Sequence, residues 1–278
     1  EIEMWVSADK QIVMVKLPTQ KLEVKLADVK AGDDAAKKIP ANYNPLSKAE
    51  VEDKDFIKNL VKVKKMKLEI SFDPKNKLDR LYLQRRAQTF TGSVEANALN
   101  GIFDIKKMSH RVTLASEWPM RAPFAIDPEY TAPAPGIDSD DPTIIERAKQ
   151  IVEPAPTIWE AARAINIWTN RNIKYERESY GAKDAVQKGK GDSHTKALVC
   201  ASMLRAVGLP ARVVRGMLML DVALDHSWVE VYLGQEIGWA PMDPTTDEVD
   251  ELCAAHVSLW LGEDMPPILA KEIITTVK

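Results

Sequence analysis

The side chains best suited to nucleophilic and acid–base chemistry are scarce in this sequence. It has four histidines and two cysteines among 278 residues, so any catalytic histidine is one of His110, His194, His226 and His256. Attack on an amide carbonyl needs a thiol or hydroxyl nucleophile, a neighbouring base, a group that orients the base, and donors for the oxyanion. These requirements restrict the candidate sites to the few segments in which such groups occur together.

Ser193 is a candidate for the nucleophile position because it follows a turn and begins an expected helix. The segment Gly189-Lys190-Gly191-Asp192 precedes it, and glycines allow a sharp turn and a close approach of a substrate backbone. The start of a helix favours an anion, and its free N–H groups can face a developing negative charge. A thiolate at such a position can have a pKa well below the usual ~8.5.

Helices and then strands are expected to position this segment. One helix should run from about Ser193 to Ala206, with Asp192 as its cap and Gly208 after its end. An earlier helix should start at the capping box formed by Thr157 and Glu160. The strands expected afterwards are 211–220, 227–233 and 238–243. Helices followed by antiparallel strands predict an α+β fold.

The first 132 residues are expected to form a separate β-rich domain with a sandwich-like architecture. The segments Lys21–Leu26 and Met66–Phe72 alternate apolar and polar residues, as half-buried strands do. Residues 133–142 are rich in turn-forming residues and have almost no periodic apolar content, so we interpret them as a linker. The second domain should therefore span residues 143–278.

Three motifs follow one another in the second half of the chain. The first runs from Gly191 to Arg212, the second is D-H-S-W-V-E-V-Y at 225–232, and the third is G-W-A-P-M-D-P-T at 238–245. In this order they resemble the transglutaminase-like superfamily, in which G-D-C precedes a helix ending in L-R-A-x-G-I-P-A-R, and H-x-W-x-E-V-Y and W-x-P-x-D-P-T strands follow. The resemblance extends over residues 142–262.

This resemblance implies a papain-like fold and acyl transfer through a covalent intermediate. The residue at position 193 would attack a glutamine side-chain amide or a peptide amide, His226 would take and return the proton, and Asp243 would orient His226. The backbone N–H of Ser193 is the candidate oxyanion donor, and Trp228 and Trp239 either line the substrate groove or pack in the core. A protein or peptide substrate is implied, and no metal or organic cofactor. Because bacterial family members are often proteases or amidases, hydrolysis is favoured over transfer to an amine.

The sequence departs from the family pattern at the nucleophile, where Ser193 stands in place of cysteine. A serine hydroxyl has a far higher pKa than a thiol, so it would depend wholly on His226 for deprotonation. One interpretation is a cysteine-enzyme framework that the serine, engineered or natural, leaves inactive or nearly so. The alternatives are a binding module that holds peptide in the same groove, a serine hydrolase using Ser193, His226 and Asp243, and a purely structural module. The complete histidine–aspartate pair favours the enzyme framework.

The remaining histidines and cysteines are expected to be structural. His110 belongs to the β-rich part, His194 should lie at the rim of the site, and His256 should pack in the closing segment. Cys200, in the middle of the expected helix, should be a buried small hydrophobe, and Cys253 has no accompanying motif. We identify no metal-ligand spacing among these residues.

Composition and charge exclude several classes of partner. The hydrophobic fraction is 45% and the net charge is −3, so no basic excess indicates nucleic acid or an anionic membrane surface. No apolar run approaches the ~18 residues that would span a bilayer. The sequence starts at Glu1 without Met or a signal peptide, and we interpret it as a trimmed or processed piece. The sequence does not identify the compartment, although an extracytoplasmic location is slightly favoured.

Overall fold

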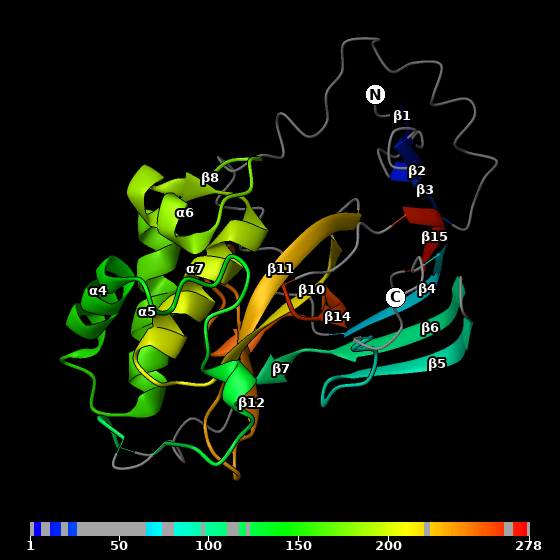
Figure 1. The fold of residues 1–278 in the computed structure, drawn as a ribbon. Helices are drawn as coiled ribbons and strands as arrows, with labels where there is room; N and C mark the ends of the chain where they lie inside the picture. The colour runs from blue at the N-terminus through cyan, green and yellow to red at the C-terminus, as the bar shows by residue number, and fades with distance from the viewer. Residues whose placement is uncertain are drawn as a thin grey trace.

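The computed structural model describes most of the second half of the chain and parts of the first. The described ranges are 81–95, 98–109, 117–120, 123–219 and 223–263, with the backbone of five further strands at 3–6, 12–17, 22–26, 65–73 and 269–276. A group of helices packs on a central antiparallel sheet, and a longer sheet lies at its far side (Figure 1). The expected α+β class is therefore confirmed.

The helical layer lies on one side of the molecule (Figure 1). Its α-helices are α4 (Pro142–Val152), α5 (Ile158–Asn172), α6 (Ala182–Lys188) and α7 (Ser193–Ala206). A short 3-10 helix, η4 (Pro128–Tyr130), precedes them. No helix in the described ranges is long and apolar enough to cross a membrane.

Both predicted helix starts are confirmed by capping contacts. The Thr157 side chain accepts the N–H of Glu160 at 3.2 Å and so caps α5. The Asp192 side chain accepts the N–H of Thr195 at 2.8 Å and so caps α7. After α7, Gly208 adopts a left-handed φ of 82°, which glycine adopts without a steric penalty.

The central sheet brings together the strands that carry the predicted site. Its order is β12 (Trp239–Met242), β11 (Ala223–Tyr232), β10 (Ala211–Met219) and β14 (His256–Leu261), all antiparallel. Gly216 of β10 lies between His226 of β11 and Ser258 of β14. A Cβ at Gly216 would lie 1.9 Å from the carbonyl oxygen of Val257, so only glycine allows β14 to approach here.

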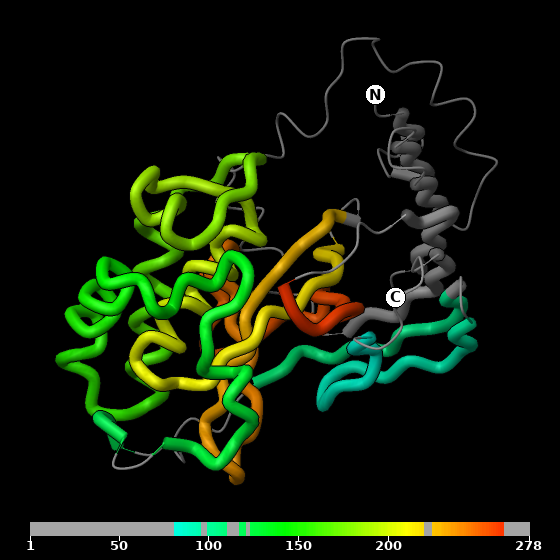
Figure 2. The backbone as a smooth tube through the Cα atoms, in the orientation of Figure 1, coloured from blue at the N-terminus to red at the C-terminus, as the bar shows by residue number. Residues whose placement is uncertain are grey.

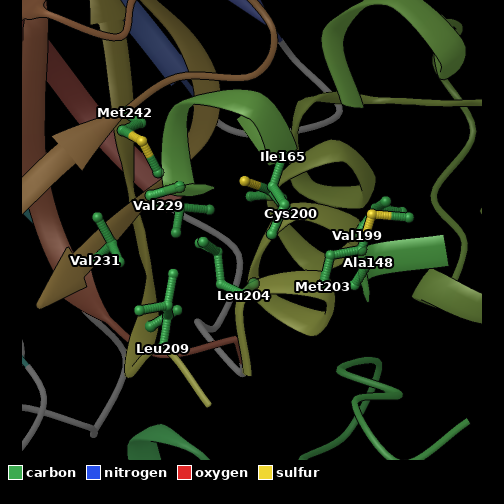
Figure 3. Close-up of a cluster of buried hydrophobic side chains, with 14 of the residues drawn as sticks. Ala148, Ile165, Val199, Cys200, Met203, Leu204, Leu209, Val229, Val231 and Met242 are labelled. Carbon is green, nitrogen blue, oxygen red and sulfur yellow. The ribbon is translucent and has the colours of Figure 1, made fainter. Parts of the chain in front are cut away.

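Helix α7 forms the centre of the hydrophobic core. Twelve of its fourteen residues are buried, so it contacts neighbours on nearly every side. It packs against the sheet and against α4 and α5 through apolar side chains (Figure 3), including Ala148, Ile165, Val199, Cys200, Met203, Leu204, Val229, Val231 and Met242. This packing fixes the N-terminal end of α7, where Ser193 lies, relative to β11 and β12.

The long sheet contains strands from both ends of the chain. Its order is β1 (Glu3–Val6), β2 (Ile12–Leu17), β3 (Leu22–Leu26), β15 (Leu269–Thr276), β4 (Lys65–Asp73), β6 (Ala98–Lys106) and β5 (Gln88–Glu95). Strands β3 and β4 correspond to the two predicted alternating segments. The C-terminal strand β15 pairs with β3 and β4, although it follows the central sheet in sequence. The predicted sandwich is not confirmed, because the described strands before residue 107 all join this one sheet.

The described part of the N-terminal half contacts the central sheet directly. Leu81 forms a β-bridge with Trp260, and the N–H of Tyr82 donates to the carbonyl of Leu259 at 2.9 Å. Strand β7 (Met108–Ser109) pairs with β13 (Glu251–Leu252), which follows β12. Figure 2 shows the segment that contains β7 running from the long sheet towards the central sheet.

Candidate active site

A histidine and an aspartate meet at the end of the central sheet. Strand β11 carries His226, and Asp243 comes directly after β12, which pairs with β11 from Val229 onwards. The Nε2 atom of His226 lies 2.7 Å from Oδ2 of Asp243, and both side chains are buried. The structure therefore brings together the predicted base and its predicted orienting group.

Asp243 has further hydrogen-bond partners besides His226. The N–H of Thr245 donates to Oδ1 at 2.7 Å, and the hydroxyl of Thr246 and Nε2 of His256 lie 2.8 and 3.0 Å from Oδ2. Burial alone would raise the pKa of Asp243. The charges of His226 and His256, and the hydrogen bonds that these residues form with Asp243, outweigh the effect of burial and hold the pKa well below its usual range. Asp243 is therefore a carboxylate, and it accepts Nε2–H of His226. Nδ1 of His226 then carries the lone pair that can take a proton.

The start of α7 lies beside this pair. His194, one residue after Ser193, has Nδ1 3.4 Å from the hydroxyl of Ser227, the neighbour of His226. Lys196 has Nζ 3.4 Å from the carbonyl of Pro244, the neighbour of Asp243. The first turn of the helix is thus held against both strand ends.

Ser193 occupies the first position of α7 and is 8% exposed. The first N–H groups of a helix have no partner within it, and the Asp192 cap takes the N–H of Thr195. The N–H groups of Ser193 and His194 are therefore the donors that the helix start can offer to an oxyanion. Among the described residues, no hydrogen bond joins the Ser193 hydroxyl to the ring of His226.

His194 is partly buried next to position 193 and is a poor candidate for the base. Its burial, with a smaller effect of the Arg215 charge, lowers its pKa to about 4. Within the described part of the chain, no carboxylate is hydrogen-bonded to His194 as Asp243 is to His226. Of the two histidines near position 193, His226 is the one oriented for proton transfer.

Sequence reasoning missed Lys196, which is buried in the same region. Its side chain is only 4% exposed, and Nζ lies 3.3 Å from the carbonyl of Asn170 and 3.4 Å from that of Pro244. Burial lowers its pKa to about 8, although the charges of Asp243 and Asp247 act in the opposite direction. Its position three residues after Ser193 on one helix was a possible signal, because residues at this spacing are neighbours on the helix surface.

Sequence reasoning also missed the role of His256, for which only packing was expected. It is fully buried, but its Nε2 atom contacts the same carboxylate oxygen as His226. Arg85, from the N-terminal half, donates from Nη2 to the carbonyl of His256 at 2.7 Å. No local pattern in the sequence indicates either contact, because both depend on how the loop after β12 folds back.

The two tryptophans do not form one groove. Trp228 is fully buried beside His226 and beneath the Arg85 guanidinium, whose carbon lies 5.6 Å from the ring centroid. The groove assignment of Trp228 is therefore wrong in this structure, and the packing alternative describes it. Trp239 pairs with Tyr232 at the opposite end of β12 from Asp243, and the Arg212 guanidinium carbon lies 4.0 Å from its ring centroid.

The remaining residues considered in the sequence are the two cysteines and His110. Cys200 is fully buried as expected, and this burial raises the pKa of its thiol, with a smaller contribution from Asp243. Cys253 is also buried, against Glu248 and His256. His110 lies outside the described residues.

A cavity of about 370 Å³ lies elsewhere, beside η4 and the start of β10. Tyr130, Arg205 and Arg212 are among its lining residues, and none of the predicted catalytic residues contributes to it. It is therefore a separate feature from the His226–Asp243 pair.

Residues 145–244 match the family model of the transglutaminase-like superfamily. This range contains Ser193, His226 and Asp243, so the match covers the candidate site. A search of curated protein sequences gave no significant match.

Several solved structures align with this chain at low sequence identity. A candidate cysteine protease from Cytophaga hutchinsonii aligns with a TM-score of 0.54 and 16% identity, over 73% of this chain and 82% of that one. The periplasmic domain of TgpA from Pseudomonas aeruginosa aligns at 0.43 and 18%, over 66% and 70%. Red sea bream transglutaminase aligns at 0.32 and 12%, over 65% and 46%. The first of these similarities supports the shared α+β transglutaminase-like fold.

Proposed function

We propose that position 193, His226 and Asp243 form an acyl-transfer site that acts on amides of a protein or peptide, with hydrolysis as the main outcome. The observation that carries this proposal is the buried 2.7 Å contact between His226 Nε2 and Asp243 Oδ2 beside the start of α7. A buried carboxylate that orients a histidine is the arrangement that general acid–base catalysis requires.

In the proposed reaction, the side chain at position 193 attacks the amide carbonyl and its proton passes to Nδ1 of His226. The N–H groups of Ser193 and His194 stabilise the oxyanion. His226 then returns the proton to the leaving amine, and water, deprotonated by the same histidine, releases the acyl group. The intermediate is an ester with serine at position 193 and a thioester with cysteine.

Serine at position 193 is expected to make this turnover slow. The helix start can stabilise a thiolate, but a serine hydroxyl has a pKa too high for such stabilisation to produce an alkoxide. The absence of a hydrogen bond between Ser193 and His226 among the described residues favours a second candidate function. In that case the domain binds peptide at this position without cleaving it.

The test compares the protein with its Ser193→Cys and Ser193→Ala variants on unfolded casein. Ammonia release, new amino termini and acyl adducts on residue 193 are measured, the last by intact mass. The proposal predicts at least tenfold faster turnover for Ser193→Cys than for the unsubstituted protein, and an adduct that Ser193→Ala lacks.

Each other result would contradict part of the proposal. Equal turnover of the unsubstituted protein and Ser193→Cys would identify a serine hydrolase. Casein binding by all three proteins, with no turnover in Ser193→Cys, would identify a binding module.

A further inference from the structure

A second buried cluster adjoins Asp243. Glu248 and Cys253 lie between β12 and β14, His256 begins β14, and each of the three is at most 5% exposed. Asp247 takes a left-handed φ of 59°, and the N–H of Asp243 donates to the carbonyl of Glu248 at 2.8 Å, so the chain makes a tight turn here. A thiol, an imidazole and a carboxylate therefore point to one place in the core.

Two distances in this cluster match those between the ligands of a tetrahedral zinc ion, and the three ligand atoms all lie within 4.8 Å of one another. Cys253 Sγ lies 3.4 Å from His256 Nδ1 and 3.7 Å from Glu248 Oε2. Zinc bonds of ~2.3 Å to sulfur and ~2.0–2.1 Å to nitrogen or oxygen give tetrahedral edges of about 3.5 Å. The three side chains would need little movement to bind an ion between them.

A bound cation would lie next to two buried carboxylates that share one hydroxyl. The Thr246 hydroxyl lies 2.8 Å from Asp243 Oδ2 and 2.8 Å from Glu248 Oε2, but it has only one hydrogen to donate. Asp243 pairs with His226, whereas Glu248 accepts the N–H of Cys253 at 2.7 Å and lies 3.7 Å from Nε2 of His256. Two buried carboxylates and a thiol are therefore close together, and a bound cation would offset part of the cost of burying the two negative charges.

We propose that Glu248, Cys253 and His256 bind one zinc ion through Oε2, Sγ and Nδ1. Binding releases the thiol proton to solvent, so the bound ligand is a thiolate. His256 would bind through Nδ1 and still donate Nε2–H to Asp243, an arrangement in which a carboxylate orients a metal-bound histidine. The zinc would thus hold the carboxylate that orients His226. The spacing Cys253-x-x-His256 in the sequence revises the earlier inference that no metal-ligand spacing exists.

Cobalt(II) tests this site because it takes the same tetrahedral geometry as zinc and reports thiolate ligation in its absorption spectrum. The full chain, stripped of metal, is titrated with Co²⁺ alone. We expect one equivalent to bind with a thiolate-to-cobalt charge-transfer band and the strong visible absorption of tetrahedral cobalt. Zinc added afterwards should displace the cobalt and abolish both bands.

Variants identify the ligands. The band should be lost in Cys253→Ser and retained in Cys200→Ser, a matched control because Cys200 is equally buried but lies in α7. It should also persist in His226→Ala, which removes the other histidine on Asp243. If Cys253→Ser fails to fold, the spectrum of the unsubstituted protein decides alone, and absence of the charge-transfer band there overturns the proposal. Loss of the band in Cys200→Ser would also overturn it. These readouts do not depend on catalysis, so they remain informative if the proposed acyl-transfer function fails.

Discussion

At the scale of single residues, Asp243 connects the groups of the candidate site. Its Oδ2 atom is contacted by His226, His256 and Thr246, and its backbone neighbour Pro244 accepts from Lys196. Fixing this carboxylate fixes the orientation of the His226 ring. Any change that moves Asp243 is therefore expected to disturb the orientation of His226 that proton transfer requires.

Lys196 provides a prediction about pH. Its pKa of about 8 in the folded protein lies below its ordinary value of 10.5, so between these values the unfolded chain binds more protons. The free energy of unfolding should consequently rise with pH in this window. Between pH 8 and 9.5 we expect the free energy of unfolding to increase by about 1–2 kcal/mol in the unsubstituted protein but not in Lys196→Met. Urea unfolding at each pH measures this change.

Two comparisons control this experiment. Lys149→Met, an exposed lysine on α4, should keep the pH dependence of the unsubstituted protein. Lys196→Met should also be the more stable protein below pH 8, where the buried lysine is charged. Equal pH dependence in the unsubstituted protein and Lys196→Met would show that Lys196 is not buried as described.

The pairing of His226 with Asp243 was predictable from the sequence, whereas the contacts of Lys196 and His256 were not. The first two residues lie in motifs on adjacent strands, and strand pairing brings such residues together. His256 reaches Asp243 only because the chain after β12 passes through β13 and returns to the central sheet as β14. A loop path of this kind depends on long-range packing and has no local signature in the residues themselves.

At the scale of elements, α7 shows how much local sequence determines. Its predicted limits agree with the structure because Asp192 and Gly208 specify the two ends by local backbone chemistry. Strand β15 shows the opposite case. Its partners β3 and β4 are distant in sequence, so no local pattern indicates that the C-terminal strand completes the long sheet.

The contact between β5 and β14 gives a second prediction. Gln88 is 1% exposed, donates to the carbonyls of Leu83 and Ser258 at 2.9 and 2.8 Å, and accepts the N–H of Ser258 at 2.9 Å. Gln88→Ala leaves these buried backbone groups without partners, so we expect it to lower the free energy of unfolding by about 2–4 kcal/mol. Urea unfolding measures the change.

Gln84→Ala is the matched control for this prediction. Gln84 is exposed and bonds only within its own hairpin, to the backbone of Phe90, so its loss should cost less than about 0.5 kcal/mol. Equal effects of the two substitutions would contradict the packing of residues 81–95 on β14.

At the scale of the whole molecule, the N-terminal half contacts the strand and the residues that hold the site in place. Tyr82 and Gln88 bond to β14, and Arg85 bonds to the carbonyl of His256 while covering Trp228. We propose a division into domains at 1–132 and 143–278. Two segments cross this division: residues 81–88 contact the central sheet, and β15 joins the long sheet. The site is therefore expected to respond to substitutions in both halves of the chain.

The most direct test of the account is the reactivity of a thiol placed at position 193. Ser193→Cys is treated with iodoacetamide at about pH 6, and the labelled cysteines are mapped by mass spectrometry, with and without His226→Ala. Cys200 and Cys253 serve as internal controls because burial raises the pKa of both thiols. An assembled acyl-transfer site predicts that residue 193 is labelled first and that labelling slows when His226 is replaced. Labelling at position 193 no faster than that of an ordinary exposed thiol, or unaffected by His226→Ala, would contradict the account.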